Sequence, residues 1–253
     1  MGGATAEGLL RGETFKNEDI TIADPAAAVL ERFSALGASV TSDNQTAAEG
    51  ADIVCVVVKP WLVEGVIRDI KPVLNYQRQL LIVIAAGITS EQLKTWLAEG
   101  ADGSILPTFL VIPNIAIAQQ QSMTFVVPVS AQPSHTKLVK DLFDELGTTI
   151  VTEERLLGAG TTLASCGIAY AMRYIRAASE GGVELGFRAA DAQQIVMQTV
   201  RGAVELLQDS GLHPEAAIDL VTTPGGLTIR GLNEMEHAGF TSSVIRGLKA
   251  GIK

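Results

Sequence analysis

Short apolar runs alternate with amphipathic stretches over residues 20–151. The β-branched run at 20–22 predicts a strand, and residues 25–36 then place apolar side chains at helical spacing. Continuous apolar runs at 53–58 and 80–86 are typical of strands buried on both faces of a sheet. Residues 89–97 predict a helix that begins at a threonine cap. Strands separated by helices predict βαβ units and a parallel sheet with right-handed crossovers.

The strand pattern ends near residue 153, and helical spacing continues from there to the C-terminus. Small and apolar residues share one face of the longest predicted helix, which indicates a core or an interface position. The sequence therefore predicts an α/β Rossmann-like dinucleotide-binding domain over 1–152, followed by an all-α domain over 153–253. The predicted helices cover 161–180, 189–209, 214–220, 227–236 and 241–248, and glycines and prolines, including Gly181-Gly182, separate them.

The chain opens with Met1-Gly2-Gly3 and continues as a predicted helix, with no strand before it. In a dinucleotide-binding fold, a first strand leads into a glycine-rich turn, and the helix that follows binds the pyrophosphate at its N-terminus. Met1 and Gly2 are either the last part of such a turn or an ordinary helix start. Since a parallel sheet without a central strand would expose backbone groups, we expect the natural chain to extend upstream by about one strand and a glycine turn.

Asp24 ends the predicted strand at 20–22, about twenty residues after the glycines. A carboxylate at this spacing can accept a hydrogen bond from the adenosine ribose, and it disfavours the 2′-phosphate of NADP. An aspartate before Pro25 is equally suited to starting a helix. Met1, Gly2 and Asp24 are therefore candidate cofactor-binding residues, and the two interpretations of Asp24 leave both NADH and NADPH open.

Composition excludes several classes of function. The net charge is −9 and no basic block exceeds two residues, which argues against a nucleic-acid surface. The longest apolar run, 80–86, is too short to cross a bilayer. The two cysteines and three histidines are scattered, so neither a disulfide framework nor a metal site is expected. These features predict a cytoplasmic protein without a bound metal.

Three motifs resemble segments of the pyrroline-5-carboxylate reductase family in the same order along the chain. They are VVKP at 57–60, IPN at 112–114 and VTTPGGLTI at 221–229. The resemblance covers essentially the whole chain, and the third motif is the most specific. It implies reduction of 1-pyrroline-5-carboxylate to L-proline with NADPH or NADH. It also implies a homodimer or higher homo-oligomer that forms through the helical domain.

The resemblance also implies a role for each motif. The backbone amides of the 221–229 loop bind the substrate carboxylate, and the hydroxyl of Thr228 meets the imine nitrogen as the catalytic group. Gly225 and Gly226 can expose N–H groups at the start of a helix, which suits an anion. The implied substrate-binding residues are Thr223, Pro224, Gly225, Gly226, Leu227 and Cys166. The implied cofactor-binding residues, beyond Met1, Gly2 and Asp24, are Val58, Lys59, Pro60, Ala86, Gly87, Pro113 and Asn114.

The chain departs from the family pattern at several positions. Residues 164–170 read ASCGIAY where the family has SGSGPAY, so Cys166 replaces a substrate-side serine with a weaker hydrogen-bond donor. Cys166 could equally be a small residue in a tight helix contact. Leu110 replaces an arginine, and Ile115 replaces a threonine. These changes leave the cofactor preference and the rate open.

Two other interpretations remain. A related imine or hydroxyacid dehydrogenase is the nearest enzyme, but such enzymes use a lysine in their helical domain. Here Lys249 and Lys253 lie at the extreme C-terminus. The other alternative is a non-catalytic nucleotide-binding paralogue, which the departures at Leu110, Ile115 and Cys166 would fit. Retention of the 221–229 loop argues against such a decayed site.

Overall fold

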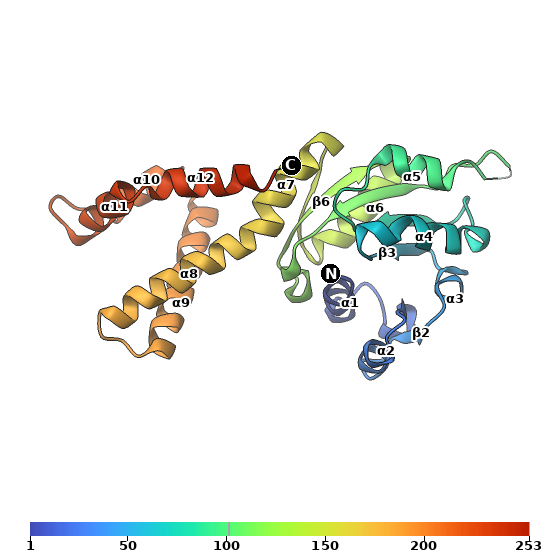
Figure 1. Cartoon of the computed structure of the whole chain (residues 1–253), viewed down its shortest axis with the longest axis horizontal. Helices are drawn as coiled ribbons and strands as arrows, with labels where there is room; N and C mark the ends of the chain where they lie inside the picture. Colours follow the sequence, from blue (N-terminus) through green and yellow to red (C-terminus); the bar gives the residue numbers. More distant parts are fainter. Residues whose placement is uncertain (101, 253) are drawn as a thin grey trace. The chain divides into compact units, whose positions relative to one another are not determined.

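A computed structural model describes residues 1–100 and 102–252 and divides the chain into two compact units, Met1–Ser165 and Cys166–Lys253. The first unit contains all the strands of the described residues, and the second contains helices (Figure 1). The predicted succession of a Rossmann-like α/β domain and an all-α domain is confirmed. The domain boundary expected after residue 152 stays a prediction.

The main sheet of the first unit has five strands, which follow one another in sequence order. The first three are parallel, β6 runs antiparallel to β5, and β7 is parallel to β6. The predicted parallel sheet is confirmed for β3, β4 and β5, and β6 departs from it. The reason is the short connection before β6, which contains only the 3-10 helix η3 and cannot carry a crossover. The elements are β3 (Ile53–Val56), β4 (Leu80–Val83), β5 (Thr108–Ile112), η3 (Ile115–Gln119), β6 (Ser122–Pro128) and β7 (Gly147–Val151).

Helices cover both faces of this sheet. Leu81 and Val83 pack against α4 and α5, whereas Ile82 and Ile84 pack against α6 and η3. Alternate residues of a strand point to opposite faces, so burial of both faces explains the unbroken apolar runs at 53–58 and 80–86. Both predicted strands are confirmed with shorter bounds. The helices are α4 (Pro60–Ile70), α5 (Ser90–Leu97) and α6 (Pro133–Asp144), and Thr89 caps α5 as predicted.

A separate pair of parallel strands, β1 (Thr21–Ala23) and β2 (Ser39–Thr41), flanks α2 (Ala27–Ser34). Among the described residues this pair makes no strand pairing with the main sheet. The opening glycines begin α1 (Gly2–Arg11), as predicted. Within the described residues α1 contacts η3, between β5 and β6, and its Glu7 forms an ion pair with Arg32 of α2.

The remaining elements of the first unit are short. They are η1 (Asn17–Asp19), α3 (Asn44–Ala48), η2 (Lys71–Val73), η4 (Glu154–Leu156), α7 (Leu157–Gly160) and the π-helical segment η5 (Thr161–Cys166), whose last residue begins the second unit. The predicted helix over 161–180 thus begins as a π-helix. π-Helical turns are rare and occur frequently at functional sites.

The second unit consists of five helices, of which α8 and α9 form the main packed pair. The predicted helix break at Gly181-Gly182 is wrong, because α8 continues through both glycines. A Cβ on Gly182 would lie 2.9 Å from the Cβ of Ala192 on α9, so this glycine permits a close helix contact. That packing outweighs the low helix propensity of glycine. The helices are α8 (Gly167–Glu184), α9 (Ala189–Ser210), α10 (Pro214–Leu220), α11 (Leu227–His237) and α12 (Phe240–Ala250).

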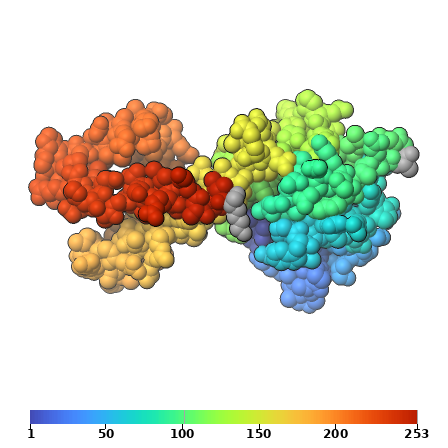
Figure 2. Space-filling model, turned by 45° about the horizontal axis from the view of Figure 1, so that its top comes forward, coloured from blue at the N-terminus to red at the C-terminus, as the bar shows by residue number. Residues whose placement is uncertain are grey.

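Side chains of the second unit are unusually exposed. Ala192 is the one buried residue among the described residues of α8–α12. Figure 2 shows α12, in red, lying along the surface of this unit. Leu185, Leu206 and Leu220 are 83%, 66% and 75% exposed. A helical unit that leaves so much apolar surface in water is typical of one that associates with another chain.

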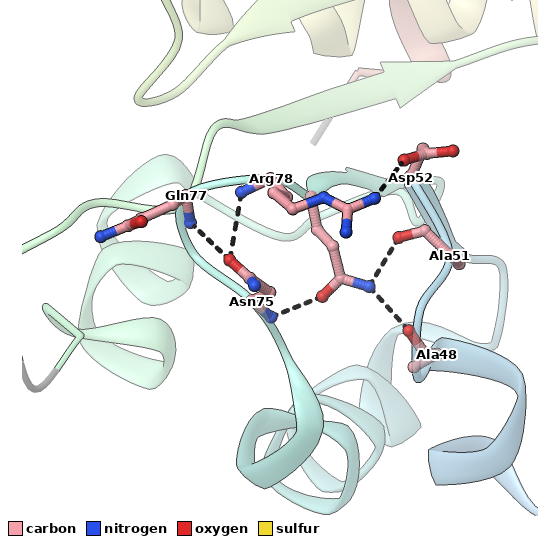
Figure 3. A network of polar contacts seen from close by, with 7 residues as sticks. Ala48, Ala51, Asp52, Asn75, Gln77 and Arg78 are labelled. Atoms are coloured by element: carbon pink, nitrogen blue, oxygen red, sulfur yellow. Dashed lines mark hydrogen bonds and ion pairs between the residues drawn. The ribbon is translucent and has the colours of Figure 1, made fainter.

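A buried amide fixes the start of two neighbouring strands. Gln79, just before β4, is 3% exposed, and its Nε2 donates to the carbonyls of Ala48 at 2.7 Å and Ala51 at 2.6 Å. Its Oε1 accepts from the backbone N–H of Asn75 at 2.6 Å. Figure 3 shows these contacts with the surface ion pair of Arg78 and Asp52. Gln79 therefore ties the end of α3 to the turn before β4.

We predict that Gln79→Leu lowers the free energy of unfolding by about 2–4 kcal/mol, because it leaves buried backbone groups without partners. Gln77→Leu is the control, since that exposed side chain bonds to Asp102 on the surface and should change stability by less than about 0.5 kcal/mol. Urea unfolding of the full chain measures both. If Gln79→Leu changed the free energy of unfolding as little as Gln77→Leu, the hydrogen bonds of Gln79 in Figure 3 would not be stabilising.

Candidate functional site

The carboxyl ends of β3, β4 and β5 bring together most of the predicted cofactor-binding residues. The three strands are parallel neighbours, and the pairs Val56–Val83 and Val83–Leu110 align their ends. In open α/β sheets this edge is where ligands bind. The predicted residues at this edge are Val58, Lys59 and Pro60 after β3, Ala86 and Gly87 after β4, and Pro113 and Asn114 after β5.

The turn after β4 offers free space at this edge. Gly87 has φ +83° and is exposed, as is Ala86 beside it. A Cβ built on Gly87 would meet nothing within 4 Å. After β3, the exposed Lys59 is the N-cap residue of α4, and Pro60 supplies the fixed φ suited to the first helical position. The edge thus has one open glycine turn and one free lysine side chain.

Asn114 has a structural task as well as its predicted binding role. It is buried and caps η3, because its Oδ1 accepts from the backbone N–H of Ala116 at 3.0 Å. Its own N–H donates to Ser122 Oγ at 3.1 Å. The side-chain oxygen of Asn114 therefore already accepts one hydrogen bond, whereas its amide NH2 group makes none among the described residues. The carbonyl of Pro113 accepts from Ser165 Oγ at 3.0 Å, a contact that the motif did not predict.

The N-terminus of α1 lies against the end of β3. A Cβ on Gly2 would be 3.3 Å from the carbonyl oxygen of Val57, so Met1 and Gly2 are brought to the same edge as Val58. The N-cap residue Met1 makes no side-chain cap. The first amides of an α-helix have no acceptor within the helix, and they favour an anion. The structure therefore places the free amides of a helix start beside the end of β3.

A glycine contact holds α1 in this position. A Cβ on Gly8 would lie 2.4 Å from the carbonyl oxygen of Ile117 in η3, so only glycine allows this approach. Because Asn114 caps η3, the same contact links α1 to the end of β5. Gly8 was not identified from the sequence. A glycine on one face of a predicted helix is too common to identify a helix contact from the sequence alone.

Asp24 follows β1 and therefore lies at the carboxyl end of the separate strand pair. Its Oδ1 accepts from the backbone N–H of Ala26 at 2.8 Å, and its own N–H donates to Thr41 at 3.2 Å. The aspartate thus forms a turn just before α2, whose N-cap residue is Ala26. Among the described residues Oδ2 has no hydrogen-bond partner, so it is free to accept from a ligand hydroxyl.

The predicted substrate loop joins α10 to α11 in the second unit. Gly225 has φ +69°, a conformation that favours glycine, and Gly226 caps α11 in an extended conformation. A Cβ on Gly226 would lie 2.5 Å from Thr223 Oγ1. The backbone conformation thus favours glycine at position 225, and the close approach of Thr223 favours it at position 226. The loop presents the unpaired amides at the start of α11 next to the exposed hydroxyl of Thr228.

Arg230 braces this loop, and the sequence motif did not identify it. Its guanidinium donates to the carbonyl of Gly225 at 2.7 Å. The contact places a positive charge beside the amides of α11.

Cys166 ends the π-helical segment and is half-buried. Pro224, Gly225 and Leu227 are exposed, and Leu227 is 85% exposed.

The described residues contain no group of three or more His, Cys, Asp or Glu side chains placed to hold a metal ion. None of the helices over 1–100 and 102–252 has both the length and the apolar character needed to cross a membrane. The candidate sites are therefore two: the strand edge of the first unit, and the 221–229 loop of the second.

Comparisons with known proteins match the two parts of the chain to two family models. Residues 154–253 match the family model for pyrroline-5-carboxylate reductase dimerisation, and residues 1–87 match that for coenzyme F420-dependent NADP oxidoreductase. Pyrroline-5-carboxylate reductase 2 of Dictyostelium discoideum is 32% identical over 98% of this chain and 86% of its own length. The chain belongs to the pyrroline-5-carboxylate reductase family. The resemblance found in the sequence is confirmed.

Two further members of the family show how far the likeness extends. Pyrroline-5-carboxylate reductase 1 of Dictyostelium discoideum is 36% identical over 98% of this chain. The chain spans about half, 46%, of the length of that relative. The solved 1-pyrroline-5-carboxylate reductase of Streptococcus pyogenes is 30% identical, with a TM-score of 0.82 over 98% of this chain and 91% of that chain. Membership of the family thus rests on both domains.

We predict that Gly8→Ala destabilises this family member by about 1–3 kcal/mol, because the added methyl group pushes α1 away from η3. It should also weaken dinucleotide binding, since the start of α1 would move from β3. Gly65→Ala in α4 is the matched control: its Cβ would meet nothing within 4 Å, and alanine favours the helix. Thermal unfolding and cofactor titration compare the two. A stable Gly8→Ala variant with unchanged cofactor affinity would contradict the contact.

Proposed function

We propose that this chain is an NAD(P)-dependent oxidoreductase that reduces the C=N bond of 1-pyrroline-5-carboxylate to L-proline, a step of proline biosynthesis. The observation that carries the proposal is the 221–229 loop. In a member of this family, it combines free amides at the start of α11, two glycines in a tight turn, and the hydroxyl of Thr228. This arrangement suits a small anionic substrate with a ring nitrogen.

Residues of the first unit fit a dinucleotide. The amides at the start of α1 suit the pyrophosphate, and the free Oδ2 of Asp24 suits a ribose hydroxyl. The open space at Gly87, which a side chain would fill, suits the nicotinamide end, together with Lys59 and the Asn114 amide. When bound, NADPH or NADH supplies the hydride that reduces the C=N carbon. The chain itself supplies binding and orientation.

The helical unit would hold the substrate. The amides at the start of α11 bind the carboxylate, and the Arg230 charge favours the same anion. Thr228 donates a hydrogen bond to the ring nitrogen, whose basicity rises as the C=N bond is reduced. A threonine hydroxyl is a poor acid, so its main role is to orient the nitrogen while water supplies the proton. Cys166 in place of the family serine gives a weaker donor on this side.

We further propose that the chain works as a homodimer through α8–α12. The exposed leucines of these helices support this, and so does the match of 154–253 to a dimerisation family. Stable protein interfaces bury about 1,200–2,000 Å² or more, which a surface of this kind can supply. A cytoplasmic location, and the lack of nucleic-acid or membrane partners, remain predictions.

Substitution of Thr228 tests the proposed site. We expect the unmodified chain to oxidise NADH or NADPH only when 1-pyrroline-5-carboxylate is present. Thr228→Val should lower kcat/KM at least about 10²-fold, because it removes the hydroxyl but keeps the size. Thr228→Ser is the control and should retain most of the activity. Cofactor binding without turnover by the unmodified chain would favour the binding-only paralogue instead.

Sedimentation tests the association. At micromolar concentration the folded chain should sediment as a dimer or a larger species, because a monomer would leave the apolar surface of α8–α12 in water. Dilution should yield no stable folded monomer if the helical unit depends on its partner. A monomer that unfolds cooperatively at all concentrations would disprove the proposed dimer.

A further inference from the structure

The carboxyl end of the two-stranded sheet carries two carboxylates. Asp24 follows β1 and Asp43 follows β2, and the pairing of Ala23 with Thr41 aligns the two strand ends. Both aspartates bond to Thr41: the N–H of Asp24 donates to its carbonyl at 3.2 Å, and the N–H of Asp43 donates to its Oγ1 at 3.1 Å. The two acidic residues are thus fixed to the same residue of β2.

Hydrogen bonds orient both side chains. Asp43 accepts from Thr46 Oγ1 at 2.6 Å and from the N–H of Gln45 at 3.2 Å. The hydroxyl of Thr46, followed by the amide of Gln45, lowers the pKa of the Asp43 carboxyl. Asp43 is therefore negatively charged at neutral pH. Asp24 is held through Oδ1, and its Oδ2 can only accept from a donor such as a hydroxyl.

The basic residues of this segment each lie near another carboxylate. Lys16 and Arg32 are the only basic residues between positions 12 and 58. In the structure Lys16 lies 3.8 Å from Glu18, and Arg32 forms an ion pair with Glu7 of α1. Sites that accept a 2′-phosphate usually supply an arginine for it. A phosphate at this strand end would instead face two carboxylates.

We infer that this chain prefers NADH to NADPH, and that Asp24 is the residue that determines the preference. The inference rests on the proposed function, since it concerns the cofactor of the same reaction. Asp24 Oδ2 accepts a hydrogen bond from the ribose 2′-hydroxyl of NADH, and it repels the 2′-phosphate of NADPH. Residues 1–87 match a family that is named for NADP, so the inferred preference for NADH differs from that family name.

Direct binding to the full chain, without substrate, tests the preference apart from turnover. Isothermal titration with NADH and with NADPH should give a Kd for NADH at least about tenfold lower, as expected for like charges a few ångströms apart. The ratio should shrink as salt is added, because the repulsion is screened. Titration with ADP-ribose and its 2′-phosphate should give the same order, which would assign the effect to the adenosine end.

Asp24→Asn removes the negative charge of this side chain and keeps its size. Its amide oxygen can still accept from the N–H of Ala26, so the turn into α2 is kept. The ratio of the two Kd values should fall several-fold towards one. Glu31→Gln is the matched control, because it removes the same charge from an exposed position on α2 and should leave the ratio unchanged. Asp24→Ser serves as a second variant in case Asp24→Asn folds poorly.

The outcomes separate this inference from the proposed function. Equal or tighter binding of NADPH by the unmodified chain would overturn the inference, while turnover of 1-pyrroline-5-carboxylate would still support the function. An unchanged ratio in folded Asp24→Asn would overturn the role of Asp24. Failure to bind either nucleotide would overturn the proposed function and the inference with it.

Discussion

Helix α1 holds together two sheets that, in the described parts of the chain, share no strand pairing. Its contact with η3 depends on Gly8, whose missing side chain lets the helix approach Ile117. On its other side the helix reaches α2 through the Glu7–Arg32 ion pair. A second link joins α3 to α4, where Gln45 donates to the backbone of Asp69 at 2.9 Å. Within the described residues these helix contacts link the strand pair that carries Asp24 to the elements around the main sheet.

The same helix sets the geometry of the cofactor edge. Because α1 is fixed against η3, its N-terminal amides lie beside the end of β3, and the Asn114 cap lies at the end of β5. In the proposed function the chain needs few specialised side chains here, since backbone amides and glycine turns would do most of the binding. The second unit follows the same principle, with the amides of α11 in place of a basic pocket. Chemistry of this kind depends on the cofactor for reactivity and on the protein for position.

Sequence patterns predicted what depends on local periodicity. The buried strands at 53–58 and 80–86, the capped helix after Thr89 and the change to helices after β7 follow from apolar spacing. Strand direction does not follow from apolar spacing: β6 is antiparallel because the connection through η3 is too short for a crossover. The break expected at Gly181-Gly182 was wrong because helix packing against Ala192 outweighs glycine's propensity.

The site shows a similar limit. Motifs located the residues at the strand ends and in the 221–229 loop, because the order of elements places them there. They could not reveal Arg230 or Ser165, whose contacts depend on the backbone conformation of Gly225 and Pro113. They also could not show that the Asn114 oxygen is already used to cap η3. Tertiary contacts of this kind leave no periodic signal in the chain.

The measurement closest to the central claim follows the hydride itself. The full chain would be incubated with 1-pyrroline-5-carboxylate and a reduced nicotinamide cofactor that carries deuterium at the transferred position. The account predicts L-proline with one deuterium on the ring carbon that belonged to the C=N bond, detected by mass spectrometry. Folded protein that binds the cofactor but yields no labelled proline would contradict the account.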